Sequence, residues 1–178
     1  MRIIAGSRKG ARIFAPKGRE TRPTSDRVRE ALFSLIGPVD DAAALDLFAG
    51  SGALGLEALS RGARSCVFVE SDPDAVRTIG RNLEKLGLTG ATVLRADALS
   101  ALAAEAGAGR RYDLVLVDPP YGLFSRVQTG LASYLPAVLA DDGLVAVETS
   151  AREEPELPLA VRTTRRYGST LVTLLAHA

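Results

Sequence analysis

The sequence predicts an α/β protein built on a doubly wound, mostly parallel β-sheet. From about residue 43, short apolar runs alternate with amphipathic runs, which is the order of elements typical of β-α-β units. The short runs are rich in Leu and Val and nearly free of charge, as expected for strands buried on both faces. A glycine-rich stretch joins the first of these strands to the first helix of the series.

The elements of this core follow from hydrophobic periodicity. In the second expected helix, Val76, Ile79, Leu83 and Leu86 recur at helical spacing, and Gly87 marks its end. The expected strands are 44–48, 65–69, 92–95, 113–117 and 144–148, and the expected helices span about 53–61, 74–86, 98–106 and 126–140. Two further strands, 159–166 and 170–175, are expected to close the sheet in an antiparallel pair.

A short unit of different character precedes this core. Residues 2–5 and 11–14 are expected to pair as a β-hairpin, and Thr24 or Ser25 is expected to cap a helix. Arg27 and Arg29 lie largely outside the apolar stripe of that helix. We therefore divide the chain into a basic N-terminal hairpin and loop, residues 1–24, and a main domain, residues 25–178.

Composition fits a globular protein of 178 residues, 47% hydrophobic and 24% charged. Its apolar runs fall far short of the roughly 20 residues that a membrane span needs, and no signal-peptide pattern is visible. The single cysteine, Cys66, excludes an internal disulfide framework and suits a reducing compartment. Since no long apolar stripe calls for a second subunit, we expect a cytoplasmic monomer.

Charge is unevenly distributed along the chain. Residues 1–29 hold nine Arg or Lys against two acidic residues, a formal +7, whereas the rest holds thirteen against nineteen, a formal −6. Such segregation favours a polyanionic partner that meets the N-terminal end, although a solvated basic arm would look the same.

The strand–helix junction carries a nucleotide-binding pattern. Gly50, Gly52 and Gly55 form G-x-G-x-x-G after a strand and at the start of a helix, and Glu70 ends the next strand twenty residues later. Asp46 precedes the loop, where a carboxylate suits a ligand with an amine and a sulfonium but not a pyrophosphate. Asp97 follows the third strand, where it can accept from an adenine amine or simply cap a helix. These carboxylates predict an S-adenosylmethionine site that also includes Phe48, Ser51 and Ala98.

The fourth strand ends in Asp118-Pro119-Pro120-Tyr121, the most specific local signal in the sequence. Two prolines fix their φ angles and remove two donors, which leaves a stiff loop of carbonyls beside the Asp118 carboxylate. An exocyclic base amine is a weak nucleophile that needs acceptors for its hydrogens, and Asp118 and the Pro119 carbonyl suit that task. Tyr121 is expected to stack on the target base. We therefore expect methylation of an exocyclic amine.

The sequence does not support methylation of a carbon atom or metal-dependent chemistry. Methylation at cytosine C5 needs a cysteine nucleophile, but Cys66 lies in the middle of a strand and away from the ligand edge. The only histidine, His177, stands beside the C-terminus, and no Cys/His cluster has metal-ligand spacing. The expected chemistry is metal-free.

With these residues assembled, the chain resembles the RsmD family of bacterial 16S rRNA guanine-N2 methyltransferases. The similarity runs through residues 2–6, 22–33, 46–62, 118–121 and 167–168. It implies the seven-stranded, Rossmann-like fold of class I S-adenosylmethionine-dependent methyltransferases, with an N-terminal β-hairpin and helix. It also implies methylation of the guanine conventionally numbered 966, in ribosomal RNA or a small ribosomal subunit. Ala5 departs from the family, which commonly has glycine there.

The resemblance also implies roles for individual residues. Asp46, Gly50, Gly52, Glu70 and Asp97 would hold the cofactor, and Asp118 and Tyr121 would serve the guanine amine. RNA would contact the hairpin and the segment 22–29, for which the candidate residues are Arg2, Arg8, Arg22, Thr24 and Arg27.

Three alternatives remain at this stage. A DNA adenine- or cytosine-amino methyltransferase would use the same loop at residues 118–121, but such enzymes usually carry a target-recognition region too large for this chain. An NAD-type oxidoreductase would account for the glycines alone and leave that loop unexplained. A non-catalytic RNA-binding module would need neither the cofactor pocket nor the loop.

Overall fold

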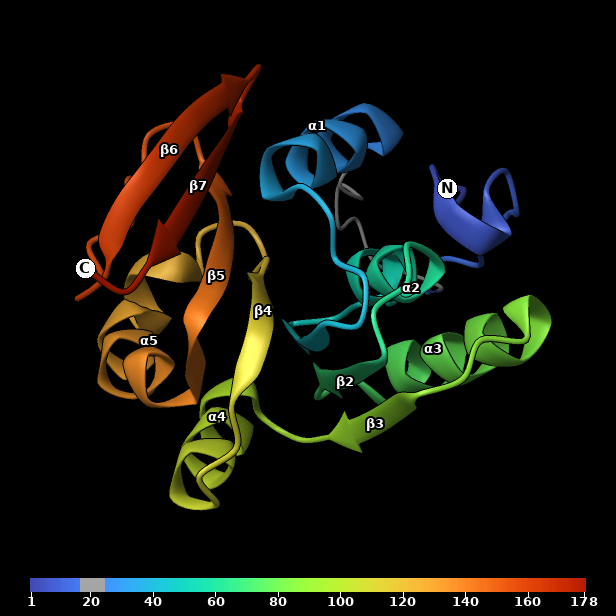
Figure 1. The fold of residues 1–178 in the computed structure, drawn as a ribbon, viewed down its shortest axis with the longest axis horizontal. Coiled ribbons are helices and arrows are strands. Elements are labelled where there is room, and N and C mark those ends of the chain that lie inside the picture. The colour runs from blue at the N-terminus through green and yellow to red at the C-terminus, as the bar shows by residue number, and fades with distance from the viewer. Residues whose placement is uncertain (17–24) are drawn as a thin grey trace.

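The structure is a computed structural model that describes residues 1–16 and 25–178. A seven-stranded sheet in the order β3-β2-β1-β4-β5-β7-β6 forms its centre (Figure 1). The strands are β1 (Ala43–Leu47), β2 (Ser65–Glu70), β3 (Ala91–Arg95), β4 (Tyr112–Val117), β5 (Leu139–Ser150), β6 (Ala160–Tyr167) and β7 (Thr170–Ala176). The helices are η1 (Gly6–Arg8), α1 (Asp26–Ile36), α2 (Ala53–Ser60), α3 (Pro73–Leu86), α4 (Ala98–Gly107) and α5 (Phe124–Val138).

Pairing in the sheet confirms the expected α/β class. Strands β3, β2, β1, β4 and β5 pair in parallel, and β7 pairs antiparallel with both β5 and β6. The chain order reverses between β1 and β4, so the loops after these two strands meet at the carboxyl edge of the sheet. Ligands bind at this position in open α/β sheets.

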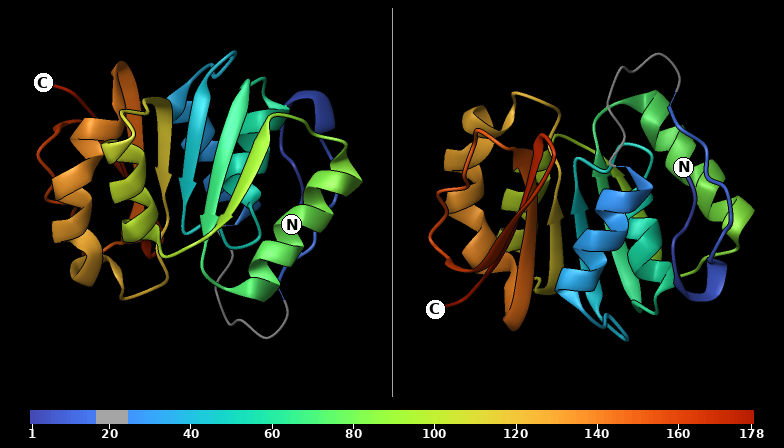
Figure 2. Two further views of the ribbon diagram at one scale, coloured as in Figure 1. Left: turned by 90° about the horizontal axis from the view of Figure 1, so that it is seen from below. Right: turned by 90° about the horizontal axis from the view of Figure 1, so that it is seen from above.

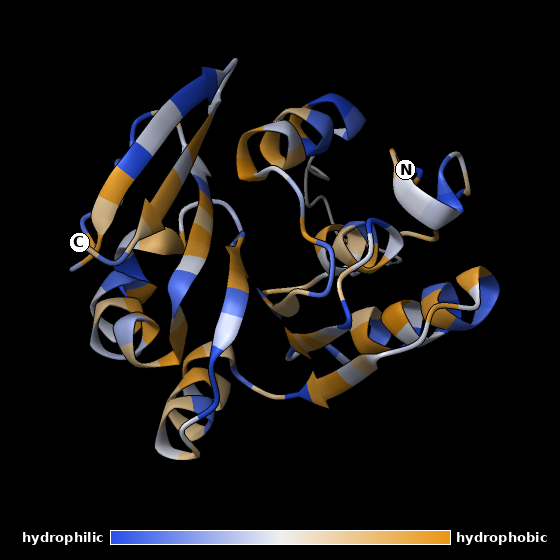
Figure 3. Ribbon diagram, in the orientation of Figure 1, coloured by the Kyte–Doolittle hydropathy of each residue, from blue (hydrophilic) through white to orange (hydrophobic). Residues whose placement is uncertain are grey.

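Helices cover both faces of the sheet (Figure 2). One face packs on α1, α2 and α3 through a cluster that includes Phe33, Leu56 and Phe68. The other face packs on α4 and α5 through a cluster that includes Leu45, Leu102 and Leu135. Figure 3 shows hydrophobic colour along the central strands and hydrophilic colour on outer helix surfaces. None of the helices in the two described ranges is long and apolar enough to cross a membrane.

Local signals set the ends of α3. Asp72 caps its N-terminus by accepting from the Asp74 and Ala75 amides, Pro73 is its first residue, and Gly87 ends the helix.

The boundary between α5 and β5 differs from the prediction. Leu139 pairs with Tyr112 and begins β5, so the predicted strand 144–148 is too short and the predicted helix 126–140 runs two residues too far. A register irregularity between Tyr112 and Leu114 accommodates this early pairing.

The N-terminal segment pairs antiparallel, but more briefly than the predicted strands 2–5 and 11–14. Only one bridge forms, between Arg2 and Arg12, although Ile3 also exchanges backbone hydrogen bonds with Ala11 and Gly10. The turn is the short 3-10 helix η1. Ile3 and Ile13 are buried in the same cluster as α1 and α2, so the segment lies against the main domain.

Helix α1 confirms one of the two alternative caps. The Ser25 hydroxyl accepts from the Val28 amide at 3.2 Å, whereas Thr24 lies outside the described residues. The expectation for Arg29 was wrong. Its side chain is fully buried because it turns toward α2 and the N-terminal segment and not toward solvent.

Candidate functional site

The loop between β1 and α2 has the backbone of a ligand-binding turn. Phe48 has φ 59°, a left-handed conformation that costs a non-glycine residue on the order of 1–3 kcal/mol and is concentrated at functional sites. Gly52 has φ 81° and caps α2 without a side-chain hydrogen bond. Because this loop follows β1, the N-terminus of α2 lies at the carboxyl edge of the sheet, directly after Ser51 and Gly52.

Gly55 is needed for packing. A Cβ atom there would lie 2.3 Å from Cε1 of Phe68 and 2.8 Å from Sγ of Cys66, so only glycine lets α2 approach β2 this closely. Cys66 is thus a buried packing residue, as expected, and burial raises the pKa of its thiol. The three glycines of the pattern occupy the settings that their spacing predicts.

Two buried carboxylates brace the loop. Asp46 is 1% exposed, and its Oδ2 accepts from the Gly55 amide at 2.9 Å. Glu70, at the end of β2, accepts from the Gly50 amide at 2.8 Å through Oε2 and from the Asp72 amide at 2.8 Å through Oε1. Each carboxylate oxygen has a second lone pair, so these bonds leave Glu70 able to accept from ligand hydroxyls.

Negative charge concentrates where the glycine loop meets the end of β4. Burial raises the pKa of Asp46 to about 8, the hydrogen bond from Gly55 opposes that shift, and the charges of Asp118 and Glu70 add to it. A cationic ligand would reverse this balance by stabilising ionised Asp46. A ligand with an amine and a sulfonium therefore fits these residues better than a pyrophosphate does.

Binding of S-adenosylhomocysteine, which retains the amine, should strengthen as pH rises from about 6 to 8. Because the free protein holds a proton on Asp46 below about pH 8, binding there must first expel it. Asp46 alone should also make the free protein less stable as pH rises from about 4 to 8, since the folded state retains a proton that the unfolded state releases.

Titration calorimetry at pH 6, 7 and 8 measures this dependence. Asp46→Asn, which cannot titrate, should bind more weakly at pH 8 and with a flatter pH profile. A wild-type affinity that does not change over this range would contradict the role of Asp46.

Asp97 lies on the same edge, after β3, but its geometry is that of a cap. It is exposed, and its Oδ2 accepts from the Ser100 amide at 3.0 Å at the start of α4. The neighbouring Ala98 is buried. A cap uses one carboxylate oxygen, so an additional contact with an adenine amine stays a prediction.

The loop after β4 rises from the same edge. Asp118 is partly buried and Pro119 is buried, while Pro120 is exposed and accepts from the Leu123 amide at 3.0 Å. Tyr121 is 88% exposed, the most exposed large hydrophobic side chain of the described residues. An exposed ring beside a partly buried carboxylate can stack on a planar group whose polar edge reaches that carboxylate.

The structure separates the residues predicted to contact RNA. Arg2 and Arg27 are exposed, and Nε of Arg2 lies 3.4 Å from Asp26 Oδ2. Arg8 is half-buried and donates to the carbonyls of Leu86 and Gly87, so its guanidinium neutralises the C-terminal end of α3. Arg22 and Thr24 lie outside the described residues.

Sequence reasoning missed Asn82, a fully buried residue of α3. Its Nδ2 donates to the carbonyls of Phe14 and Ser51, both at 3.0 Å, and its Oδ1 accepts from the Phe14 amide at 2.7 Å. This one side chain ties the N-terminal segment to the glycine loop. The signal was available, because Asn82 follows Ile79 by three residues and therefore lies on the inner face of the helix.

Asn82→Ala should lower the free energy of unfolding by about 2–3 kcal/mol, since it removes a fully buried amide and its three hydrogen bonds to the backbone of Phe14 and Ser51. The change should also weaken S-adenosylhomocysteine binding, because the Ser51 carbonyl loses its anchor. Urea unfolding and calorimetry measure both effects. Glu84→Ala, on the exposed face of the same helix, is the control and should change stability by less than about 0.5 kcal/mol. Equal effects of the two substitutions would show that Asn82 is not the anchor.

A second missed group is the buried Glu57 of α2. Its carboxylate accepts from the amides of Ile4 and Ala5 at 2.9 and 3.0 Å and from Arg61 Nε at 2.8 Å. Arg29 completes the network, with its Nε 3.6 Å from Glu57 Oε2. A lone acidic residue inside the apolar helix sequence of α2 was the signal for this network. Glu57 and Asn82 thus both hold the N-terminal segment against the main domain, as Arg8 does through its bonds to the end of α3.

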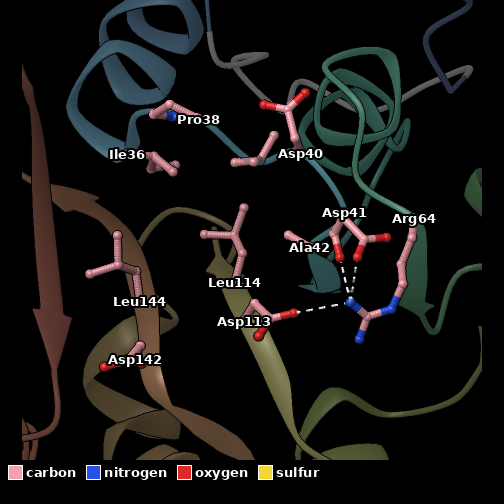
Figure 4. Close-up of a pocket in the computed structure, with 11 residues that line it drawn as sticks. Ile36, Pro38, Asp40, Asp41, Ala42, Arg64, Asp113, Leu114, Asp142 and Leu144 are labelled. Atoms are coloured by element: carbon pink, nitrogen blue, oxygen red, sulfur yellow. Dashed lines mark hydrogen bonds and ion pairs between the residues drawn. The ribbon is translucent and has the colours of Figure 1, made fainter.

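A surface depression lies away from these residues. This cavity of about 360 Å³ is lined by residues that precede β1 and β2, begin β4 or lie in the first half of β5, which places it at the amino edge of the sheet. Figure 4 shows Arg64 directed toward Asp41 and Asp113, with Nη1 4.0 Å and 3.7 Å from their carboxylates. These side chains are about half exposed or more, so the depression is a solvated ion-pair cluster remote from Asp46 and Asp118.

Comparison with known proteins gives relatives that match most of this chain. A family model described as Conserved hypothetical protein 95 matches residues 1–176. "Putative rRNA methyltransferase YlbH" of Bacillus subtilis is 42% identical over 98% of this chain and 97% of that protein. "Ribosomal RNA small subunit methyltransferase D" of Escherichia coli K12 is 40% identical over 88% of this chain and 75% of that protein.

Solved structures share the fold. "Putative methyltransferase yhhF" from Escherichia coli superimposes with a TM-score of 0.85 at 37% identity and covers 100% of this chain and 98% of that one. A SAM-dependent methyltransferase from Agrobacterium tumefaciens shares the fold with a TM-score of 0.65 at 17% identity, over 84% of this chain and 61% of that one. The chain therefore belongs to the family described as Conserved hypothetical protein 95, the RsmD family of S-adenosylmethionine-dependent methyltransferases.

Proposed function

We propose that the protein methylates ribosomal RNA, and specifically the exocyclic N2 amine of the guanine of 16S rRNA conventionally numbered 966. The observation that carries the proposal is the placement of Asp118 after β4, close enough to the glycine loop for its charge to act on buried Asp46. An acceptor for amine hydrogens thus lies beside a site suited to a cationic methyl donor. The names of the two curated relatives, both rRNA methyltransferases, support ribosomal RNA as the substrate.

Residues at the carboxyl edge of the sheet would hold the cofactor. S-adenosylmethionine supplies a methyl group made electrophilic by its sulfonium. Asp46 would offset the positive charge and Glu70 would accept from ribose hydroxyls, while Asp97 and Ala98 would lie at the adenine. The backbone of the loop Phe48–Gly55 would line the pocket, including Gly50, Ser51 and Gly52. No metal ion is needed for this transfer.

The loop after β4 would prepare the acceptor. Asp118 and the Pro119 carbonyl would each accept an N–H from the guanine amine, so that electron density builds on nitrogen as it takes the methyl group. The displaced proton would pass from nitrogen to Asp118 and on to water. Pro119 and Pro120 keep the loop stiff, and Tyr121 would stack on the base to hold it near in-line with the methyl group.

The N-terminal unit, residues 1–24, would bind RNA ahead of the methyltransferase domain, residues 25–178. Arg2 and Arg27 are exposed and suited to phosphate contacts, and Arg22 and Thr24 are proposed from the sequence alone. The Arg8 guanidinium donates to carbonyls at the C-terminal end of α3, so its contribution to RNA binding would be indirect.

The direct test is methylation of purified 16S rRNA and small ribosomal subunits from a strain that lacks this protein, followed by mapping of the modified base. A single N2-methylguanine is expected, and comparison of the two substrates shows whether naked RNA suffices. Methylation of DNA, of adenine or of cytosine would contradict the proposal. Calorimetry with S-adenosylhomocysteine and NAD tests the cofactor separately, and tight binding of NAD alone would overturn it.

A further inference from the structure

Strand β6 presents exposed arginines at one end of the sheet. Arg162, Arg165 and Arg166 are exposed, and no Asp or Glu occurs between residues 157 and 178. The strand lies at the sheet edge farthest from β3, while the N-terminal segment lies over α2 and α3 (Figures 1 and 2). Figure 3 shows hydrophilic colour at the end of β6 that approaches α1. This positive surface is therefore separate from the basic N-terminal segment.

Strand register sets the level of these arginines relative to the reaction centre. Val117 of β4 pairs with Val147, Val147 pairs with Thr173, and Thr173 pairs with Thr164 of β6. One and two residues farther along, Arg165 and Arg166 stand level with Asp118 and Pro119. Three strand spacings of about 4.8 Å put them roughly 14 Å away across the carboxyl edge. Arg162 lies on the amino side of that level.

The arginines at this level are not neutralised by the protein. Arg165 Nη1 donates to the Thr164 carbonyl and Arg166 Nε donates to the Gly168 carbonyl, both at 3.0 Å. Within the described ranges, neither guanidinium has a carboxylate within 4.0 Å, whereas those of Arg61 and Arg110 do. A guanidinium has five N–H donors in a planar fork that matches phosphate oxygens.

We propose that Arg165 and Arg166 bind backbone phosphates of the RNA that flanks the target guanine. This inference rests on the proposed function and adds a second RNA-binding surface at the open edge of β6, on the β6 side of the 118–121 loop. The two neighbouring side chains leave opposite faces of this edge strand, so phosphates would reach both along its open edge. Together with the N-terminal segment, it would hold RNA on two sides of the reaction centre.

The test is Arg165→Gln combined with Arg166→Gln. We expect affinity for a 16S rRNA fragment containing the target to fall roughly tenfold near 0.1 M salt, with the slope of log affinity against log salt reduced by about 2. Fluorescence anisotropy over a salt series measures both quantities. S-adenosylhomocysteine affinity, measured by calorimetry, should stay unchanged, because neither side chain belongs to the cofactor site.

Arg162→Gln is the matched control. It is equally an exposed arginine of β6 with a backbone hydrogen bond, from Nη2 to the His177 carbonyl at 3.1 Å, but it lies away from the level of Asp118. It should retain wild-type affinity and salt slope. An equal loss in Arg162→Gln, or no loss in the double variant, would overturn the inference.

Failure of this inference can be told apart from failure of the proposed function. If wild-type protein methylates the fragment and the double variant binds it equally well, only the β6 surface is wrong. If wild-type protein neither binds nor methylates ribosomal RNA, both proposals fail. A double variant that binds naked RNA normally but loses activity on small subunits would indicate a contact with ribosomal protein, which also contradicts the inference.

Discussion

Replacing Asp118 with alanine is expected to lower kcat for rRNA methylation by roughly 10²–10³-fold, the usual cost of losing one polar group that stabilises a transition state. The amine of guanine gains nucleophilic character only while its hydrogens are held by acceptors. Alanine removes the carboxylate and leaves the Pro119 carbonyl alone. Single-turnover methylation at saturating RNA isolates this step from binding.

S-adenosylhomocysteine affinity should change little in Asp118→Ala, and its pH dependence should move to lower pH. The charge of Asp118 contributes to the raised pKa of Asp46, so its removal should lower that pKa. Asp113→Ala is the matched control, because Asp113 is exposed at the opposite end of the same strand. Turnover near the wild-type rate in Asp118→Ala would contradict the proposed role.

Glu57→Ala should cause the largest loss of stability, about 3–5 kcal/mol, because it removes the buried carboxylate beside the Arg29 guanidinium and leaves that buried charge paired with the partly exposed Asp26, 2.9 Å from Nη2. Arg29 is fully buried, and its Nε and Nη1 already lack hydrogen-bond partners in the structure. Removal of Glu57 would also leave the Ile4 and Ala5 amides unpaired. Urea unfolding monitored by circular dichroism measures the change. Glu30→Ala, an exposed substitution on α1, should change stability by less than about 0.5 kcal/mol.

A double substitution separates lost charge pairing from lost packing. Glu57→Leu combined with Arg29→Met replaces the buried pair by apolar groups and should be less destabilising than the sum of the two single changes. Strict additivity would show that Glu57 and Arg29 act independently.

The sheet could be predicted from the sequence because its signals are local. Strands buried on both faces read as short apolar runs, and Asp72, Pro73 and Gly87 mark the ends of α3 directly. The start of β5 could not be predicted, since Leu139 follows a helix with no break and becomes a strand only by pairing with Tyr112. The strands of the N-terminal hairpin were predicted too long for a related reason. Backbone amides of this segment donate to the side chains of Glu57 and Asn82 and not across the hairpin.

In the candidate site, too, some features could be predicted from the sequence and others depend on tertiary contacts. Asp46 lies near the end of β1, Glu70 ends β2 and Asp118 follows β4, and these parallel strands are neighbours in the sheet, so sheet topology alone was enough to bring the three carboxylates to one edge. The positions of Arg8 and Arg29 depend on tertiary contacts, and the sequence offers no sign that one caps α3 while the other is buried against Glu57. Asn82 could have been found from its helical spacing, but a buried amide gives no hint of which backbone groups it joins.

Transfer to the exocyclic amine is tested most directly by two RNA substrates that differ only at the target base. Inosine is guanosine without the exocyclic amine, so it removes the proposed acceptor and leaves the rest of the base nearly unchanged. We expect rapid methyl transfer to a small-subunit RNA fragment with guanosine at the target position. When inosine takes that place, we expect binding without any transfer, and methylation of the inosine substrate at the same position would contradict transfer to the exocyclic amine.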